Sequence, residues 1–102
     1  MKIVISKSYG GFWVSEAFLK HYKIPYKLDD LFKQPRPKEN ITRTDKRLIK
    51  YIETYGSEAA SGKFSNLVVK TIPAGTAYRI CNYDSYEYIE YRDEIEWQIA
   101  ED

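Results

Sequence analysis

Cysteine and histidine are nearly absent from this sequence, and their scarcity excludes several kinds of chemistry. The single cysteine, Cys81, cannot form an intramolecular disulfide, and one cysteine without a signal peptide is typical of a reducing compartment. A structural zinc site needs a full tetrahedral set of Cys and His ligands, and this chain offers Cys81 and His21 alone. We therefore expect an intracellular domain that works without a metal or cofactor.

Long hydrophobic runs are also missing. No apolar stretch approaches the roughly 20 residues of a membrane-spanning helix, and residues 2–5 are too few for an export signal. A chain of 102 residues fits one domain and can bury about two thirds of its unfolded surface. We expect a single domain over residues 1–102, away from membranes. It has a polar loop at about 27–43 and a tail at 93–102 that is either frayed or an edge strand.

Aromatic residues and unevenly placed charges are what the sequence has in plenty. Tyrosine accounts for 10 residues, and its amphipathic ring suits either a padded core or an exposed contact surface. Residues 1–50 carry 12 Lys/Arg and 5 Asp/Glu, whereas residues 51–102 carry 4 and 10, so the net charge of +1 hides a split. Such a split can steer an anion to one face or favour head-to-tail association of copies. The two fields largely cancel if both halves share one core, which is the interpretation we favour.

A strand and a helix are predicted at the amino-terminal end. The β-branched run at residues 2–6 predicts a strand. Ser15 is a good cap for a helix that runs to about Lys23, and Val14 with Leu19 matches a hydrophobic staple.

The second predicted helix begins after Thr44 and ends at Gly56. Thr44 caps it, Asp45 favours the positive end of the helix dipole, and Gly56 is a typical terminator. Residues 57–66 are rich in Ser, Ala and Gly and predict irregular structure. The apolar stripe that should face a sheet recurs at helical spacing: Leu48, Ile49, Ile52 and Tyr55.

Three further strands are predicted over residues 67–72, 78–83 and 86–91. Turn residues separate them, at 73–75 and again at 83–85. The order of strand, helix, helix and antiparallel strands predicts an α+β fold. We expect an antiparallel sheet of about four to five strands, with two helices packed on one face.

Catalytic chemistry has little support in the sequence. Cys81 lies in the middle of a strand, in an apolar context typical of a small buried hydrophobe, and His21 is expected at the solvated surface of the first helix. The carboxylates of Asp84, Glu87 and Glu90 lack the spacing of a metal-binding loop. We expect a binding protein more than an enzyme, although no motif decides between the two.

The pair Gly10-Gly11 lies between a predicted strand and the start of a helix. Its backbone N–H groups could cradle a phosphate or a carboxylate. The pair lacks the Lys-Ser/Thr of a phosphate loop and the glycine pattern of a dinucleotide site, and Glu16 would oppose an anion. The alternative is a tight turn above Phe12 and Trp13, and the sequence leaves both interpretations open.

A tyrosine-rich hairpin is the other candidate. Its rings could stack on a nucleobase or dock on a protein. Long nucleic acid fits poorly because this region is net acidic, but a small nucleotide with Arg79, or a lysine of the basic amino-terminal half, on its phosphate fits better. The rings concerned are Tyr83, Tyr86, Tyr88, Tyr91 and Trp97.

Three parts of the chain resemble a family of small, largely uncharacterised phage and prophage proteins. The Tyr-Gly-Gly-Phe piece at residues 9–12 is the most specific of the matching motifs. Ser8 stands where the family often has Cys, which argues against a thiol mechanism here, and Ser85 stands where it often has Gly. The matching parts are residues 2–5 with 9–12 and Ser15, residues 48–56, and residues 69–73 with 78–80 and 83–87.

The resemblance implies a phage accessory protein in the cytoplasm of a bacterial host, and it carries over no activity or site residues. Such proteins often blunt host defence. Some sequester nucleotide immune signals, and others bind and block defence proteins.

We expect a counter-defence protein that binds and sequesters a small nucleotide-derived immune signal. The rival is an inhibitor that binds a host defence protein, in the manner of anti-CRISPR proteins, and a third reading is an enzyme that degrades the signal. A homo-oligomer with a pocket between copies is compatible with these roles. The predicted ligand-binding residues combine backbone donors, stacking rings and a guanidinium: Tyr9, Gly10, Gly11, Phe12, Arg79, Tyr83, Tyr86 and Tyr88.

Overall fold

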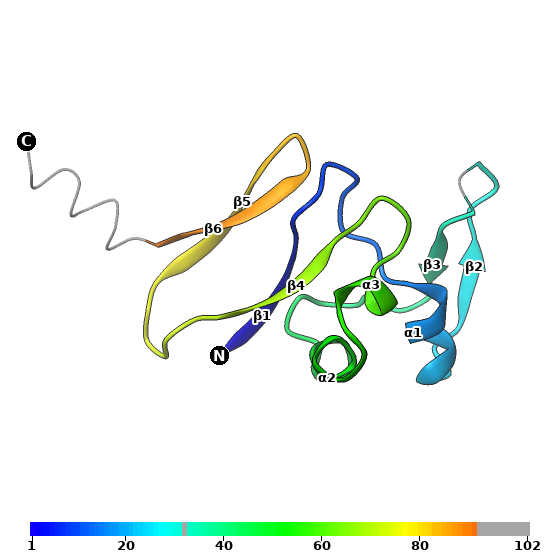
Figure 1. Ribbon diagram of the computed structural model, residues 1–102, viewed down its shortest axis with the longest axis horizontal. Coiled ribbons are helices and arrows are strands. Elements are labelled where there is room, and N and C mark those ends of the chain that lie inside the picture. Colours follow the sequence, from blue (N-terminus) through cyan, green and yellow to red (C-terminus); the bar gives the residue numbers. More distant parts are fainter. Residues whose placement is uncertain (32, 92–102) are drawn as a thin grey trace, which may run out of the picture.

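The computed structural model describes residues 1–31 and 33–91, which form a mixed α and β fold (Figure 1). The described strands pair into three antiparallel two-stranded sheets, β1 with β4, β2 with β3, and β5 with β6. In chain order the elements are β1 Lys2–Ser6, α1 Glu16–His21, β2 Tyr26–Leu28, β3 Pro35–Pro37, α2 Lys46–Tyr55, α3 Ser57–Ala60, β4 Leu67–Thr71, β5 Tyr78–Tyr83 and β6 Tyr86–Tyr91.

The β1–β4 pair is the centre of the fold because both of its faces are apolar. Val4 lies opposite Val69, and this face packs on the helices. Ile3 and Ile5 point the other way because side chains alternate along a strand, and both are buried. Figure 1 shows the helices on one side of this pair and the β5–β6 hairpin on the other. The residues with the least exposure in the helical core are Val4, Phe18, Leu19, Leu48, Ala60 and Leu67.

The expected single sheet of four to five strands is not what the described residues form, because the outer edge of β1 is already occupied. The Val4 N–H donates to the Arg43 carbonyl at 2.8 Å, and the Ser6 N–H donates to the Glu87 carboxylate at 2.7 Å. These groups take the place of a neighbouring strand on that edge. The hairpin therefore covers a face of the β1–β4 pair and does not extend it as a ladder.

The first helix forms where the sequence predicts it. Ser15 is the N-cap, and its hydroxyl accepts the N–H of Phe18 at 3.1 Å. Val14 and Leu19 are both buried, as a hydrophobic staple requires. The helix ends at His21, slightly before the expected Lys23.

The second helix begins one residue later than predicted. Asp45, not Thr44, is its N-cap, and the carboxylate accepts the N–H groups of Arg47 at 2.8 Å and Leu48 at 3.3 Å. The Arg47 guanidinium also donates to Asp45 at 2.9 Å and, with these backbone bonds, holds the pKa of that carboxyl below its ordinary 3.8. Gly56 ends the helix, as predicted, and has φ of 95°.

Two segments expected to be irregular contain regular structure. The loop at 27–43 holds most of the β2–β3 pair, which Arg36 fastens by a 2.7 Å ion pair to Asp29. Proline is tolerated in so short an edge pair because its missing N–H faces away from the partner. The segment 57–66 begins with the short helix α3. The expected frayed or edge-strand tail at 93–102 lies outside the described residues.

None of the helices within residues 1–31 and 33–91 is long and apolar enough to cross a lipid bilayer.

Candidate functional site

The amino-terminal turn and the tyrosine hairpin meet in space. The rings of Tyr9 and Tyr86 are in contact, with centroids 5.3 Å apart and planes inclined by 43°. The two-residue turn of the hairpin has positive φ at both positions, 52° at Asp84 and 72° at Ser85, which is the geometry of the tight primed turns. This turn sets Tyr83 directly opposite Tyr86. Two of the predicted regions are thus brought together by the fold.

The two glycines are explained by a tight turn. A Cβ on Gly10 would lie 2.0 Å from the Phe64 carbonyl oxygen, and Gly11 has φ of 91°. The Gly10 N–H donates to the Ser8 hydroxyl at 3.3 Å, so this amide is not turned outward toward an anion. The Gly11 carbonyl accepts hydroxyls from Ser6 at 2.7 Å and Ser65 at 2.8 Å. The geometry favours the turn over the anion cradle.

Phe12 packs against a polar hub, formed by Ser6, Arg43 and Glu87, that joins the turn to the hairpin. The Arg43 guanidinium lies over its ring, 4.2 Å from the centroid, and forms an ion pair with Glu87. Glu87 is 7% exposed and also accepts the Ser6 N–H. Glu87 was considered from the sequence only as a metal ligand, and its pairing with Arg43 was not predicted, because no local pattern signals an ion pair between residues so far apart in the chain. Phe12 is therefore covered by a cation of the protein itself.

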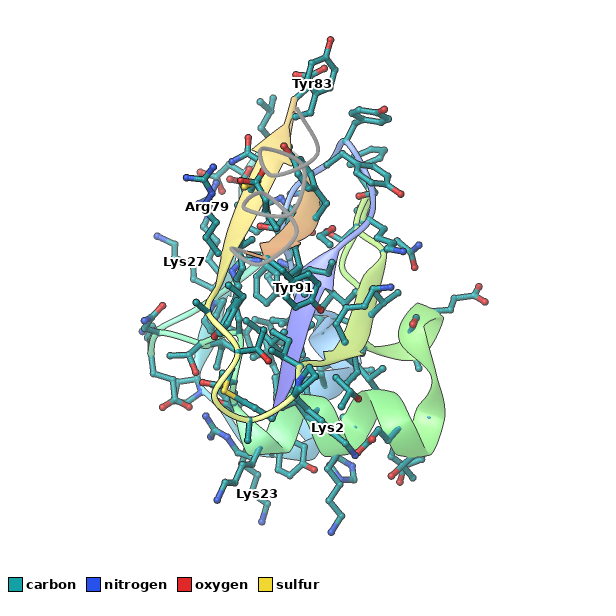
Figure 2. All side chains as sticks on the ribbon, turned by 90° about the vertical axis from the view of Figure 1, so that its left-hand side faces the viewer. Lys2, Lys23, Lys27, Arg79, Tyr83 and Tyr91 are labelled. Atoms are coloured by element: carbon teal, nitrogen blue, oxygen red, sulfur yellow. The ribbon has the colours of Figure 1, made fainter. Side chains whose placement is uncertain are left out.

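Arg79, the predicted phosphate partner, already pairs with a carboxylate of the protein. Its guanidinium donates to Glu90 on the neighbouring strand, with the Nε–Oε1 distance at 2.9 Å. This hydrogen bond and the Glu90 charge raise the pKa of Arg79. Figure 2 shows Tyr83 at the tip of the hairpin and Arg79 farther along it. A phosphate at Arg79 would therefore compete with Glu90 for this guanidinium.

Exposed aromatic rings gather around the meeting point. Tyr9, Phe64 and Tyr83 are 64%, 69% and 75% exposed. Phe64 has φ of 65°, an unusual conformation for a bulky residue, and packs its backbone onto Gly10. Tyr86 touches Tyr9 and pairs with Tyr83, so the rings follow one another along one end of the molecule. The sequence analysis missed Phe64, which no local pattern distinguishes.

A pocket of about 250 Å³ opens between β6 and the β1–β4 pair. Lys7 and Lys70 line it together with Tyr88. The neighbouring Lys7 side chain, with its charge, lowers the pKa of Lys70. Over residues 1–31 and 33–91, no carboxylate forms an ion pair with either lysine. The complete lining is Ile5, Lys7, Lys70, Tyr88, Ile89 and Tyr91.

The alternation of side chains along β1 and β4 places both lysines on one face of this strand pair. Lys7 follows Ile3 and Ile5 at the same parity, and Lys70 lies directly opposite Ile3 in the ladder. Both lysines therefore belong to the face that the hairpin covers. Neither lysine was singled out from the basic half of the chain, because neither the pairing of β1 with β4 nor the position of the hairpin over that face was predicted.

Two other concave regions are larger, and a basic residue that lines each of them is engaged in contacts within the protein. A groove of about 420 Å³ beside Trp13 holds Arg36, whose guanidinium lies 4.9 Å from the Trp13 ring centroid and pairs with Asp29. A groove of about 780 Å³ beside α2 is lined by Lys2, which pairs with Glu53 at 2.5 Å.

Potential catalytic groups are dispersed. His21 is exposed as expected, but its ring contacts three tyrosines at 4.7–5.7 Å between centroids. Cys81 is half-buried, contrary to the expectation of a fully buried thiol, because its strand face is open beside Glu90. Within the described ranges, no three His, Cys, Asp or Glu side chains gather to hold a metal ion.

Comparison of the chain with protein-family models, curated proteins and solved structures finds no match.

Proposed function

We propose that this chain is a phage accessory protein that binds and sequesters a small nucleotide-derived immune signal of its host. The observation that carries the proposal is the contact of Tyr9 with Tyr86, 5.3 Å between ring centroids, which joins the turn to the hairpin. Exposed rings at a fixed spacing suit a flat ligand, since stacking is worth roughly 1–3 kcal/mol per base.

Rigidity of the region supports this role. The Glu87 carboxylate accepts the Ser6 N–H at 2.7 Å and pairs with Arg43, so hairpin and turn are fastened beneath the exposed rings. A preorganised site loses less conformational freedom on binding than a mobile one. Two lysines in the adjoining pocket, Lys7 and Lys70, offer positive charge for the anionic part of a nucleotide.

Calorimetric titration with cyclic nucleotides, ADP-ribose and mononucleotides tests the proposal. We expect at least one nucleotide to bind and to be recovered intact after denaturation of the complex, which distinguishes sequestration from turnover. Tyr86→Ala should weaken binding by about tenfold or more, because it removes one stacking ring.

Tyr55→Ala is the matched control, since Tyr55 is an exposed tyrosine on α2, apart from the hairpin. It should leave binding unchanged. The absence of heat for every nucleotide would argue against the proposed function, and recovery of degraded nucleotide would favour an enzyme.

A protein-blocking inhibitor is the second candidate, favoured by one observation. Phe64 and Tyr83 are large, exposed rings at the same end as Tyr9, and such rings often anchor protein interfaces. This candidate predicts that a host defence protein is captured at stoichiometric amounts. It also predicts that Phe64→Ala and Tyr83→Ala release that protein while nucleotides have no effect.

A further inference from the structure

We propose that Lys7 and Lys70 form a clamp for a phosphoryl group, and that Tyr88 flanks the rest of the ligand. The inference rests on the proposed function and names the chemical class of its ligand as a phosphorylated small molecule of about mononucleotide size. In this proposal the two lysines supply the positive charge that was expected from Arg79, which pairs with Glu90.

The fold places the two ammonium groups together by strand pairing. Lys7 follows β1, and its N–H donates to the Asn66 carbonyl at 2.9 Å, which continues the ladder beyond Ser6. Lys70 lies on β4, opposite Ile3. Both side chains reach the pocket above Ile5, where β6 forms the other wall. Residues far apart in the sequence are thereby held on one rigid pair of strands.

The two positive charges favour an anion in this pocket. Lys7 and Lys70 line the same pocket and repel each other, and no carboxylate of the described residues forms an ion pair with either of them. A phosphoryl dianion between the two would receive charge-assisted hydrogen bonds from both. Pairs of like charge that lack a counter-ion are found in a protein's binding and catalytic sites.

The volume and the lining of the pocket limit the size and kind of ligand further. The pocket volume of about 250 Å³ falls just below the roughly 300–1,000 Å³ of drug-sized sites, so it suits a phosphoryl group and part of one nucleoside. Tyr88 is exposed at its edge and lies one alternation from Tyr86 on the same face of β6. The base of a nucleotide whose phosphate lies between the two lysines would therefore extend toward the rings of Tyr9 and Tyr86, which are in contact.

Titration with adenosine 5′-monophosphate, adenosine and inorganic pyrophosphate tests the clamp. We expect the monophosphate and pyrophosphate to bind the full chain, and adenosine to bind at least about tenfold more weakly. Lys7→Gln and Lys70→Gln should each reduce affinity for the phosphorylated probes by about tenfold or more. Lys27→Gln is the matched control, because Lys27 lies on β2, away from this pocket (Figure 1).

Thermal unfolding separates a binding role from a structural one. Each Lys→Gln variant at the clamp should unfold at the same temperature as the wild type or higher, since it removes a like-charge contact. A lower unfolding temperature for both variants would overturn the clamp, because it would show that the lysines serve the fold.

The outcomes distinguish this inference from the proposed function. Nucleotide affinity that is unchanged by both lysine substitutions would overturn the clamp but would not contradict sequestration. Lysine-dependent pyrophosphate binding, with no binding of any nucleotide, would support the clamp and contradict sequestration. No binding of any probe would overturn both.

Discussion

At the residue scale, the hairpin turn holds two non-glycine residues in the left-handed region. Ser85 has φ of 72°, and a side chain there costs roughly 1–2 kcal/mol that glycine avoids. Glycine also has more freedom to lose on folding, which offsets part of the gain. The net effect decides how firmly Tyr83 and Tyr86 are held opposite each other.

Ser85→Gly should therefore raise the free energy of unfolding by about 0.5–1 kcal/mol, measured by chemical denaturation. Ser85→Ala is the control and should lie within about 0.5 kcal/mol of the wild type, because the Cβ atom that causes the strain remains. A Ser85→Gly variant less stable than the wild type would show that the serine hydroxyl stabilises the turn.

At the element scale, the start of α2 depends on one carboxylate. Asp45 accepts two backbone N–H groups and is held by Arg47, whereas the neighbouring Thr44 is exposed. Because the native pKa of Asp45 lies below 3.8, its stabilising effect is complete above that pH. The effect is lost as the pH falls through the lowered value.

Asp45→Ala should destabilise the protein by about 0.5–2 kcal/mol at neutral pH, and the difference from the wild type should shrink in strong acid. Thr44→Ala is the matched control and should change stability by less than about 0.5 kcal/mol. Urea denaturation across pH measures both. Equal losses for the two variants would mean that the cap is shared.

Local patterns in the sequence predicted most of the elements but not their assembly. β1, β5 and β6 match the predicted ranges, and Ser15 and Gly56 bound their helices as expected. These features depend on neighbouring residues, through alternation, capping and turn chemistry. The short β2–β3 pair was missed because each strand has three residues and β3 contains two prolines, which count against a strand in the sequence.

The candidate site was harder to predict for the same reason. Tyr9 and Tyr86 were both identified, and the fold brings them together. Lys7 and Lys70 were missed because their proximity depends on the pairing of β1 with β4. Arg79 was expected to face a phosphate, yet a cross-strand carboxylate engages it.

At the scale of the whole molecule, one carboxylate joins the three parts around the site. Glu87 lies on β6, accepts the N–H of Ser6 on β1, and pairs with Arg43, which in turn covers Phe12. Loss of its charge would leave a partly buried guanidinium without an anion. The position of the hairpin over β1 should depend on this hub.

Glu87→Gln should reduce the free energy of unfolding by about 1.5–3 kcal/mol, because it weakens hydrogen bonds to a charged group. Backbone amides of β5 and β6 should also exchange faster with deuterium. Glu90→Gln is the control, since its exposed pair with Arg79 is worth about 1 kcal/mol or less. Equal effects of the two variants would contradict a special role for Glu87.

Mass spectrometry of the small molecules released from protein purified out of bacteria with active nucleotide signalling is the decisive test of nucleotide sequestration. The account predicts an intact phosphorylated nucleotide in near-stoichiometric amount from the wild type, and little from the Lys7→Gln/Lys70→Gln double variant. Recovery of no phosphorylated compound from the wild type, or equal recovery from both proteins, would contradict it.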